Sequence, residues 1–282
     1  MSDRVNLTDD SSDQFPRSLQ LPKQSPIFWV QQKDRYLRQL LIRDIERVTK
    51  RPLAVYFANR FKPESQIDHG DIAYMAELLW QVRKRPLDLL VETNGGFTDA
   101  TEGLISLLKS STTDLRVIVI NAAKSNGTMI CLAANEIIMG PTSELGPIDP
   151  HLDGIPTTIL IEPQIAAQNY PLHRLAQYAI QQTEKLATQL LKNGMLKGQP
   201  EAKIKEVVRT LSTREVFHSH GSVIDHLEAS TLGLNIKYLV QGDELWDRLW
   251  LLYCMYSHDL SARGYLKVFE GAHVSMSIAA SK

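Results

Sequence analysis

The most constraining feature of this sequence is an alternation of two hydrophobic periods between residues 53 and 139. Strands joined by crossover helices form a largely parallel sheet with both faces covered, and ligands bind at the carboxyl ends of such strands. The alternation therefore predicts an α/β fold with a mostly parallel sheet, crossover helices and functional loops directly after the strands. The expected strands are 53–57, 87–91, 115–120 and 137–139, and the expected helices between them are 71–84, 98–109 and 126–134.

The segments on either side of this alternation have different patterns. Residues 1–26 are polar and have no hydrophobic period, which predicts a flexible tail. Residues 32–50 have apolar side chains at helical spacing, and the Arg51-Pro52 pair ends this helix. After residue 170 we expect mainly helical structure, with helices at 172–193, 201–211 and 243–256, a short helix before a strand at 235–240, and one more strand within 263–280.

These changes of pattern suggest a division of the chain. We expect a tail over 1–26, a main domain over 27–240 with a helical elaboration at 170–232, and a C-terminal helix and tail over 241–282.

Composition restricts the partners and the location of the protein. The 282 residues include 31 Lys and Arg against 32 Asp and Glu, so a net charge of -1 gives no field that attracts nucleic acid. No run of about 18 apolar residues predicts a membrane span, and the polar N-terminus lacks the apolar core of a signal peptide. Cys131 and Cys254 lack the spacing of a zinc site or a disulfide framework. We therefore expect a cytoplasmic protein without a bound metal.

Two loops at the predicted ligand edge have unusual compositions. The first, residues 92–99, places Gly95 and Gly96 between a strand and a helix, where backbone N–H groups can approach an anion. The second, residues 121–128, places Ser125 at the start of the next helix, where orphan N–H donors can stabilise an oxyanion. Both loops also have a purely structural interpretation, because paired glycines form tight turns and serine is a preferred helix cap.

The two loops combine with later motifs into a recognisable set. The sequence has Asn-Gly-Gly at 94–96 and Lys-Ser-Asn-Gly-Thr at 124–128, followed by Ala-Ala-Asn-Glu-Ile-Ile-Met-Gly at 133–140, Ser-Glu-Leu-Gly-Pro-Ile-Asp-Pro at 143–150, His-Gly-Ser-Val-Ile at 220–224 and Gly-Leu-Asn-Ile at 233–236. Over residues 52–239 this combination resembles the serine dehydrogenase proteinase family. That family is a relative of Clp proteases and signal-peptide peptidases within the Clp/crotonase superfamily.

The resemblance implies a site as well as a fold. It implies that Ser125 is the nucleophile of a serine peptidase, and that the N–H groups of Gly96 and Asn126 form the oxyanion hole. The family is described with Ser, Asp and His in that order along the chain, and the matching positions are Ser125, Asp149 and His220. In these roles His220 takes the hydroxyl proton, and Asp149 fixes its tautomer and stabilises the imidazolium.

The base has alternatives that the sequence leaves open. His151 follows Ser125 at nearly the spacing of the Clp protease histidine, although the resembled family more often has Gln there. His218 would share a face with His220 if their segment were extended. Signal-peptide peptidases pair serine with lysine, but an exposed lysine with a pKa of about 10.4 is a poor base at neutral pH. We therefore expect Lys124 and Lys185 to be solvated or substrate-contacting charges.

The expected function follows from the resemblance. It implies a hydrolase, a serine protease, that acts on a peptide or protein substrate without an organic cofactor and assembles into a homo-oligomer. Two alternatives use the same fold. In a crotonase-like enzyme the loop amides would polarise an acyl-thioester carbonyl, and Ser125 would be incidental. In a non-catalytic oligomeric scaffold the fold would serve assembly alone.

Overall fold

The computed structural model of the protein describes residues 25–80, 82 and 84–280. In this part of the chain one central sheet has seven strands, in the order β11-β10-β1-β2-β3-β5-β9. Five adjacent strands are parallel, and two at one edge are antiparallel. The parallel strands are β1 (Leu53–Ala58), β2 (Arg85–Glu92), β3 (Thr112–Ile118), β5 (Glu136–Met139) and β9 (Ile236–Tyr238), and the antiparallel ones are β10 (Tyr265–Glu270) and β11 (Ser275–Ala279).

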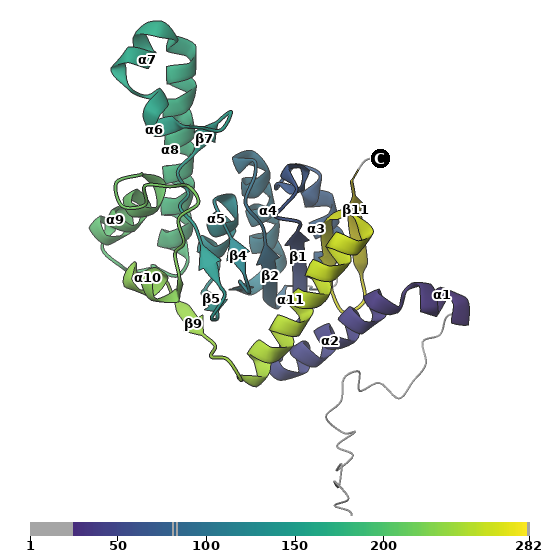
Figure 1. The fold of residues 1–282 in the computed structure, drawn as a ribbon. Helices are drawn as coiled ribbons and strands as arrows, with labels where there is room; N and C mark the ends of the chain where they lie inside the picture. The colour runs from purple at the N-terminus through teal and green to yellow at the C-terminus, as the bar shows by residue number, and fades with distance from the viewer. Residues whose placement is uncertain (1–24, 81, 83, 281–282) are drawn as a thin grey trace, which may run out of the picture.

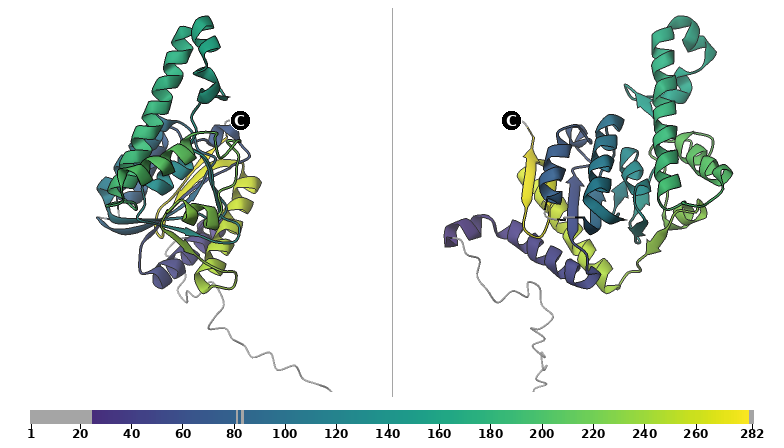
Figure 2. Two further views of the ribbon diagram at one scale, coloured as in Figure 1. Left: turned by 90° about the vertical axis from the view of Figure 1, so that its left-hand side faces the viewer. Right: turned by 180° about the vertical axis from the view of Figure 1, so that it is seen from behind.

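Helices cover both faces of this sheet, which confirms the predicted α/β architecture (Figures 1 and 2). A core on one face joins the sheet to α3 (Asp71–Leu79), α4 (Thr98–Ser111), α5 (Asn126–Leu132), α8 (Tyr170–Asn193), α9 (Glu201–Ser212) and α10 (His226–Thr231). A second core on the other face joins it to α2 (Lys33–Thr49) and α11 (Glu244–Arg263). The strands and helices predicted between residues 32 and 240 are present, with ends that differ by up to about five residues, and the helix expected at 243–256 extends to Arg263.

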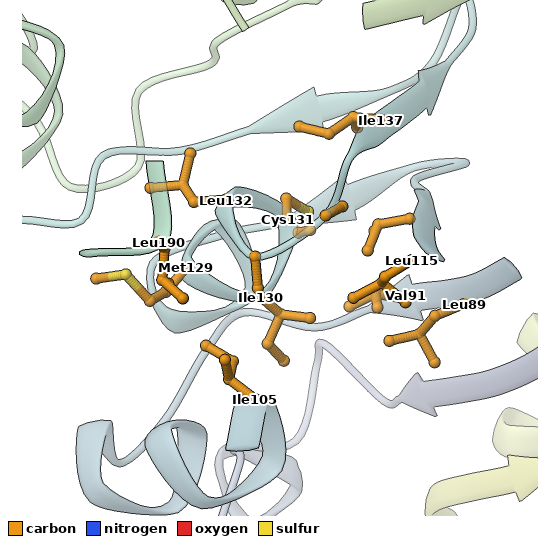
Figure 3. Packing of buried hydrophobic residues seen from close by; sticks show 14 of the residues in the cluster. Leu89, Val91, Ile105, Leu115, Met129, Ile130, Cys131, Leu132, Ile137 and Leu190 are labelled. Atoms are coloured by element: carbon orange, nitrogen blue, oxygen red, sulfur yellow. The ribbon is translucent and has the colours of Figure 1, made fainter. Parts of the chain in front are cut away.

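Helix α5 lies inside the first core, and this fixes the loop that precedes it. Figure 3 shows Met129, Ile130 and Leu132 of α5 among side chains from α4, α8 and the sheet. Cys131 is fully buried, and burial raises the pKa of its thiol, as befits a small apolar core residue. The start of α5 therefore has a rigid position at the edge of the sheet.

The C-terminal segment differs from its prediction. The single strand expected within 263–280 is wrong, because the chain turns at Gly271, whose N–H donates to the carbonyl oxygen of Val274, and forms a hairpin of β10 and β11. Strand β10 then pairs antiparallel with β1, with Val55 opposite Glu270. Residues 241–282 were expected as a separate part, yet they contribute two strands to the central sheet. The division of the chain into domains stays a prediction.

Shorter elements connect these layers. Helix α1 (Pro26–Gln31) precedes α2. Residues 1–24 of the expected tail lie outside the described part of the chain. Helix α8 projects beyond the sheet, with short elements packed along its outer part (Figure 1). The remaining elements are η1 (Pro63–Ser65), β4 (Ala122–Ala123), β6 (Glu144–Leu145), β7 (His151–Leu152), β8 (Ile155–Pro156), α6 (Thr157–Leu160) and α7 (Pro163–Gln168). None of the described helices is long and apolar enough to cross a membrane.

A buried ion cluster ties the second helical layer to the edge of the sheet. Arg38 of α2 donates from Nε to Glu270 Oε2 of β10 at 2.7 Å and forms an ion pair with Asp259 of α11. The hydroxyl of Tyr256 donates to the same Glu270 carboxylate at 2.6 Å. The Arg38 and Glu270 side chains are almost fully buried, so each carboxylate depends on the guanidinium for its charge balance.

We predict that Arg38→Met lowers the free energy of unfolding by about 3–5 kcal/mol, because it leaves two buried carboxylates without their cation. Urea unfolding measures the change. The control is Lys192→Met on α8, whose ion pair with Glu201 is solvent-exposed on both sides. Its expected cost is small, because an exposed ion pair adds little stability. Equal costs for the two variants would contradict the structural role given to Arg38.

Candidate active site

The loops that follow β2 and β3 are held together by their backbones. The N–H of Thr93 donates to the carbonyl oxygen of Ala122, and the N–H of Lys124 donates to that of Thr93, both at 3.0 Å. Gly127 packs against Thr93, since a Cβ at this glycine would lie 2.6 Å from Thr93 Cγ2. The glycine-rich loop and the serine loop therefore form one unit at the carboxyl ends of the strands.

The paired glycines are both required by close contacts. Gly95 has φ of 99°, and a Cβ there would lie 2.8 Å from the Cβ of Ser125. A Cβ on Gly96 would lie 2.3 Å from the backbone N and O atoms of Ile67. Two hydrogen bonds hold this approach, from the Ile67 N–H to the Gly95 oxygen and from the Phe97 N–H to the Ile67 oxygen. The Gly-Gly pair thus allows the loop to pass between Ile67 and Ser125.

Ser125 has a strained backbone at the turn from strand to helix. Its φ of 52° and ψ of -121° lie in a region that side chains other than glycine rarely adopt. Although Ser125 occupies the cap position of α5, its side chain makes no capping hydrogen bond. The interpretation of Ser125 as a simple helix cap therefore does not explain its conformation. Strain of this kind persists where the surrounding contacts enforce it, and it exposes the hydroxyl at the turn.

Two backbone N–H groups remain available beside Ser125. Within the described residues, the N–H groups of Gly96 and Asn126 have no hydrogen-bond acceptor. The side chain of Asn126 donates to the Gly96 carbonyl oxygen at 2.6 Å and fixes the two groups relative to each other. A helix start and a glycine loop thus present free donors on the same side of the site.

His220 and Asp149 form a close pair next to these loops. Nδ1 of His220 lies 2.6 Å from Oδ1 of Asp149, whose side chain is 2% exposed. Nε of Arg214 donates to the other carboxylate oxygen at 3.0 Å. Burial raises the pKa of Asp149, but the hydrogen bonds from His220 and Arg214 outweigh it and hold the pKa below its usual value. Asp149 is therefore a carboxylate that accepts from both neighbours.

His151 lies against His220 but has a different environment. The two rings are edge to face, with centroids 4.2 Å apart. Nδ1 of His151 lies 3.1 Å from the Asp149 carbonyl oxygen, and Nε2 lies 3.0 Å from Nη2 of Arg214. Because a guanidinium only donates, Nε2 accepts and Nδ1 carries the hydrogen. Burial and the charge of His220 lower the pKa of His151, so the ring is neutral.

A cavity of about 860 Å³ joins these groups. It opens between the two loops, the segment around His151 and one side of helix α8. Asp149 lies behind His220 rather than on the cavity wall. The sequence-predicted residues on the wall are Gly96, Ser125, Asn126, His151 and His220. The structure therefore brings together every residue that the family resemblance assigned to the site.

The other candidate bases lie elsewhere. The expectation of a solvated Lys124 is wrong, because this lysine is 7% exposed and its Nζ donates to the carbonyl oxygens of Leu145 and Ser222 and pairs with Glu144. Lys185 is exposed on α8 and does not line the cavity. His218 lies in an irregular segment, outside any strand, and its Nδ1 lies 3.0 Å from the Arg214 carbonyl oxygen.

Sequence reasoning missed two charged residues of the site. Arg214 follows the end of α9 in a turn, and no local pattern distinguishes it from a solvated arginine. Glu92 ends β2 and accepts from the Asn121 side chain and from the Ala122 N–H, which bridges the two loops. Burial raises the pKa of Glu92 to about 7. The sequence could have pointed to Glu92, because a charged residue directly after an apolar strand lies at the edge of the sheet where a site is expected.

Three side chains have the arrangement of possible metal ligands. Asp149, His151 and His220 offer ligand atoms within 4.8 Å of one another. However, Arg214 already donates to Asp149 and to His151, so a cation would have to displace a guanidinium from both groups. This donor set fits a metal poorly.

The family comparison matches residues 73–267 to the ClpP-like SDH-type serine proteinases, and the chain belongs to this family. Among curated proteins it is similar to two from Methanocaldococcus jannaschii, both named as uncharacterized. MJ0137 is 32% identical over 161 residues, which are 55% of this chain and 54% of that protein. MJ1495 is 28% identical over 158 residues, which are 54% of this chain and 52% of that protein. The chain thus spans about half the length of the curated relatives it matches.

Solved structures resemble parts of the chain at low identity. A mutant of ClpP1 from Listeria monocytogenes is 18% identical, with a TM-score of 0.46, over 74% of this chain and 99% of that chain. A mutant of the 1510-N membrane-bound stomatin-specific protease is 18% identical, with a TM-score of 0.41, over 66% of this chain and 79% of that chain.

We predict that Arg214→Met raises the pKa of His151, because the guanidinium opposes protonation of this ring by its charge and occupies Nε2. NMR titration of the histidine side chains measures the change. Arg209→Met is the matched control, since Arg209 pairs with the exposed Glu215 and should leave the His151 pKa unchanged. A lower or unaltered pKa in Arg214→Met would contradict the hydrogen bond to Nε2.

Proposed function

We propose that the protein is a serine peptidase that cleaves peptide bonds through an acyl-enzyme on Ser125. The observation that carries the proposal is the shared cavity of an uncapped, strained Ser125, a histidine with a carboxylate partner and two free N–H donors. Nucleophile, base and oxyanion donors in one cavity are the parts that acyl transfer requires. The family of ClpP-like serine proteinases supports the same reaction.

The first step forms the acyl-enzyme. His220 Nε2 takes the proton of the Ser125 hydroxyl as Oγ attacks the carbonyl carbon of the peptide. The oxygen of the tetrahedral intermediate accepts hydrogen bonds from the Gly96 and Asn126 N–H groups. When the intermediate collapses, the C–N bond breaks and the imidazolium gives its proton to the leaving amine.

The second step restores the enzyme. Water gives a proton to His220 and attacks the ester carbonyl, and the same two N–H groups stabilise the second intermediate. Its collapse breaks the bond to Ser125 Oγ, which takes the proton back from the imidazolium. The products are a carboxylic acid and an amine, and the sequence of steps consumes one water molecule.

His220 is the proposed base because its two ring nitrogens have the required environments. Nδ1 donates to the Asp149 carboxylate, which leaves Nε2 as the acceptor, and Nε2 makes no hydrogen bond to any other described residue. In His151 the corresponding nitrogen already accepts from Arg214. Lys124 has its donors committed to two carbonyl oxygens and Glu144. We therefore assign Asp149 to orient His220, and Arg214 to position Asp149.

The same residues favour hydrolysis over the acyl-thioester alternative. An enzyme that only polarises a thioester carbonyl needs the two N–H donors but has no use for a histidine and carboxylate pair beside the serine. The substrate class of peptides or proteins, the assembly into a homo-oligomer and the cytoplasmic location are part of this proposal. The family of ClpP-like serine proteinases supports the peptide or protein substrate, and the net charge of -1 gives no attraction to polyanions.

We predict that Ser125→Ala abolishes peptide hydrolysis and labelling by a fluorophosphonate probe, and that His220→Ala lowers both rates by about 10⁴-fold or more. Peptide mapping should locate the label on Ser125. His218→Ala is the control, because His218 is two residues from His220 but lies off the cavity wall, and it should keep wild-type rates. Full activity in Ser125→Ala would remove the mechanism, and a stronger loss in His151→Ala than in His220→Ala would transfer the role of base.

We also predict that EDTA leaves the labelling rate of Ser125 unchanged, since Arg214 occupies the acceptor atoms of Asp149 and His151 that a cation would need. Probe labelling before and after dialysis measures this. Loss of labelling that returns on addition of Zn²⁺ would instead identify the Asp149, His151 and His220 cluster as a metal centre.

A further inference from the structure

A buried charge cluster next to the glycine loop has no part in the proposed chemistry. Lys267 of β10 is 1% exposed, and its Nζ lies 2.6 Å from Asp68 Oδ2 and 2.7 Å from Asp71 Oδ1. The hydroxyl of Tyr56 on β1 donates to the second oxygen of Asp71 at 2.8 Å. The lysine reaches residues about 200 positions earlier in the chain, because the C-terminal hairpin is paired with β1.

The two carboxylates shape the turn that follows Ile67. The N–H of Asp68 donates to Asp71 Oδ2, and the N–H of Gly70 donates to Asp68 Oδ1. Burial raises the pKa of Asp71, and Lys267 opposes this effect. Burial also raises the pKa of Asp68, but the hydrogen bond and charge of Lys267 outweigh it, and the pKa is lowered. Without Lys267 the two carboxylates lose the cation that allows both to stay charged side by side.

This turn is in direct backbone contact with the proposed oxyanion hole. Ile67 precedes Asp68, and its N–H and C=O bond to Gly95 and Phe97, on either side of Gly96. Because a Cβ on Gly96 would lie 2.3 Å from the Ile67 backbone, the two segments have no space to move independently. A displacement of Ile67 therefore moves the N–H of Gly96.

We propose that Lys267 is a positioning residue that fixes the Gly96 N–H for catalysis through Asp68 and Ile67. The C-terminal hairpin, which lies far from Ser125 in the sequence, would thereby set one of the two donors that stabilise the oxyanion. The catalytic consequence rests on the proposed function, whereas the structural link from Lys267 to Gly96 does not. Donors of this kind act only when their position matches the transition state, and small displacements are costly.

The kinetic test compares Lys267→Met with Arg38→Met. The second variant removes a buried cation that binds Glu270 on the same strand β10, but the carboxylates of its partners Asp259 and Glu270 make no hydrogen bond to the glycine loop among the described residues. Both variants lose stability, and assays are run at a temperature where both are folded. For Lys267→Met we expect kcat to fall by about 10- to 100-fold with KM changed by less than about threefold. Arg38→Met should keep kcat within about twofold, and Lys267→Arg should recover part of the loss, since it retains the charge.

Hydrogen exchange tests the link without any activity. The Ile67 N–H is protected by its bond to Gly95 and the Phe97 N–H by its bond to Ile67, and both should exchange faster in Lys267→Met but not in Arg38→Met. If Lys267→Met does not fold, Asp68→Asn breaks the same link at a side chain that is 41% exposed. Unchanged exchange at both amides would overturn the proposal, and so would faster exchange with wild-type kcat. A wild-type protein that is neither labelled at Ser125 nor active would instead refute the proposed function, and the exchange result would still decide the link.

Discussion

A short backbone pairing between the loops after β2 and β3 holds the candidate site together. The Thr93 N–H and C=O bond to the segment around Ala123, and the Glu92 carboxylate accepts from Asn121 and Ala122. Gly95 reaches Ser125 only because these contacts draw the loops together. Helix α5 then packs its apolar residues in the core and fixes the far side of the Ser125 turn. Strain at Ser125 is stable here because contacts on both sides enforce it.

Buried or half-buried charges recur around this site, and each one binds an irregular segment of the chain. Lys124 binds two carbonyl oxygens and Glu144, Arg214 binds Asp149, and Lys267 binds the turn at Asp68. Loops lack the hydrogen-bond ladders of helices and strands, so their buried polar groups need side-chain partners. Because desolvation offsets most of the attraction in a buried ion pair, such pairs add little net stability. We infer that their main effect is to define one geometry for the loops.

Much of the fold was predictable from local sequence. Strands β1, β2, β3 and β5 and their helices follow from hydrophobic periods, and the predicted α/β architecture and family are confirmed. The sequence predicts one strand where the structure has the hairpin of β10 and β11, because the segments before and after Gly271 have similar compositions. The prediction of a solvated Lys124 was wrong, because the residues next to it in the sequence do not show that its Nζ donates to the distant carbonyl oxygens of Leu145 and Ser222. The roles of the site residues stay predictions.

The sequence by itself determined which segments become strands and helices and which loops carry glycine and serine, because hydrophobic period and backbone preference act over a few residues. Only the tertiary structure decided how three histidines near the site differ. Asp149 meets His220 from 71 positions away, and Arg214 meets Asp149 from 65 positions away. Hydrogen-bond partners set the tautomers of His220 and His151, and burial lowers the pKa of His151. Such contacts depend on the arrangement of the sheet and helices, which local sequence does not encode.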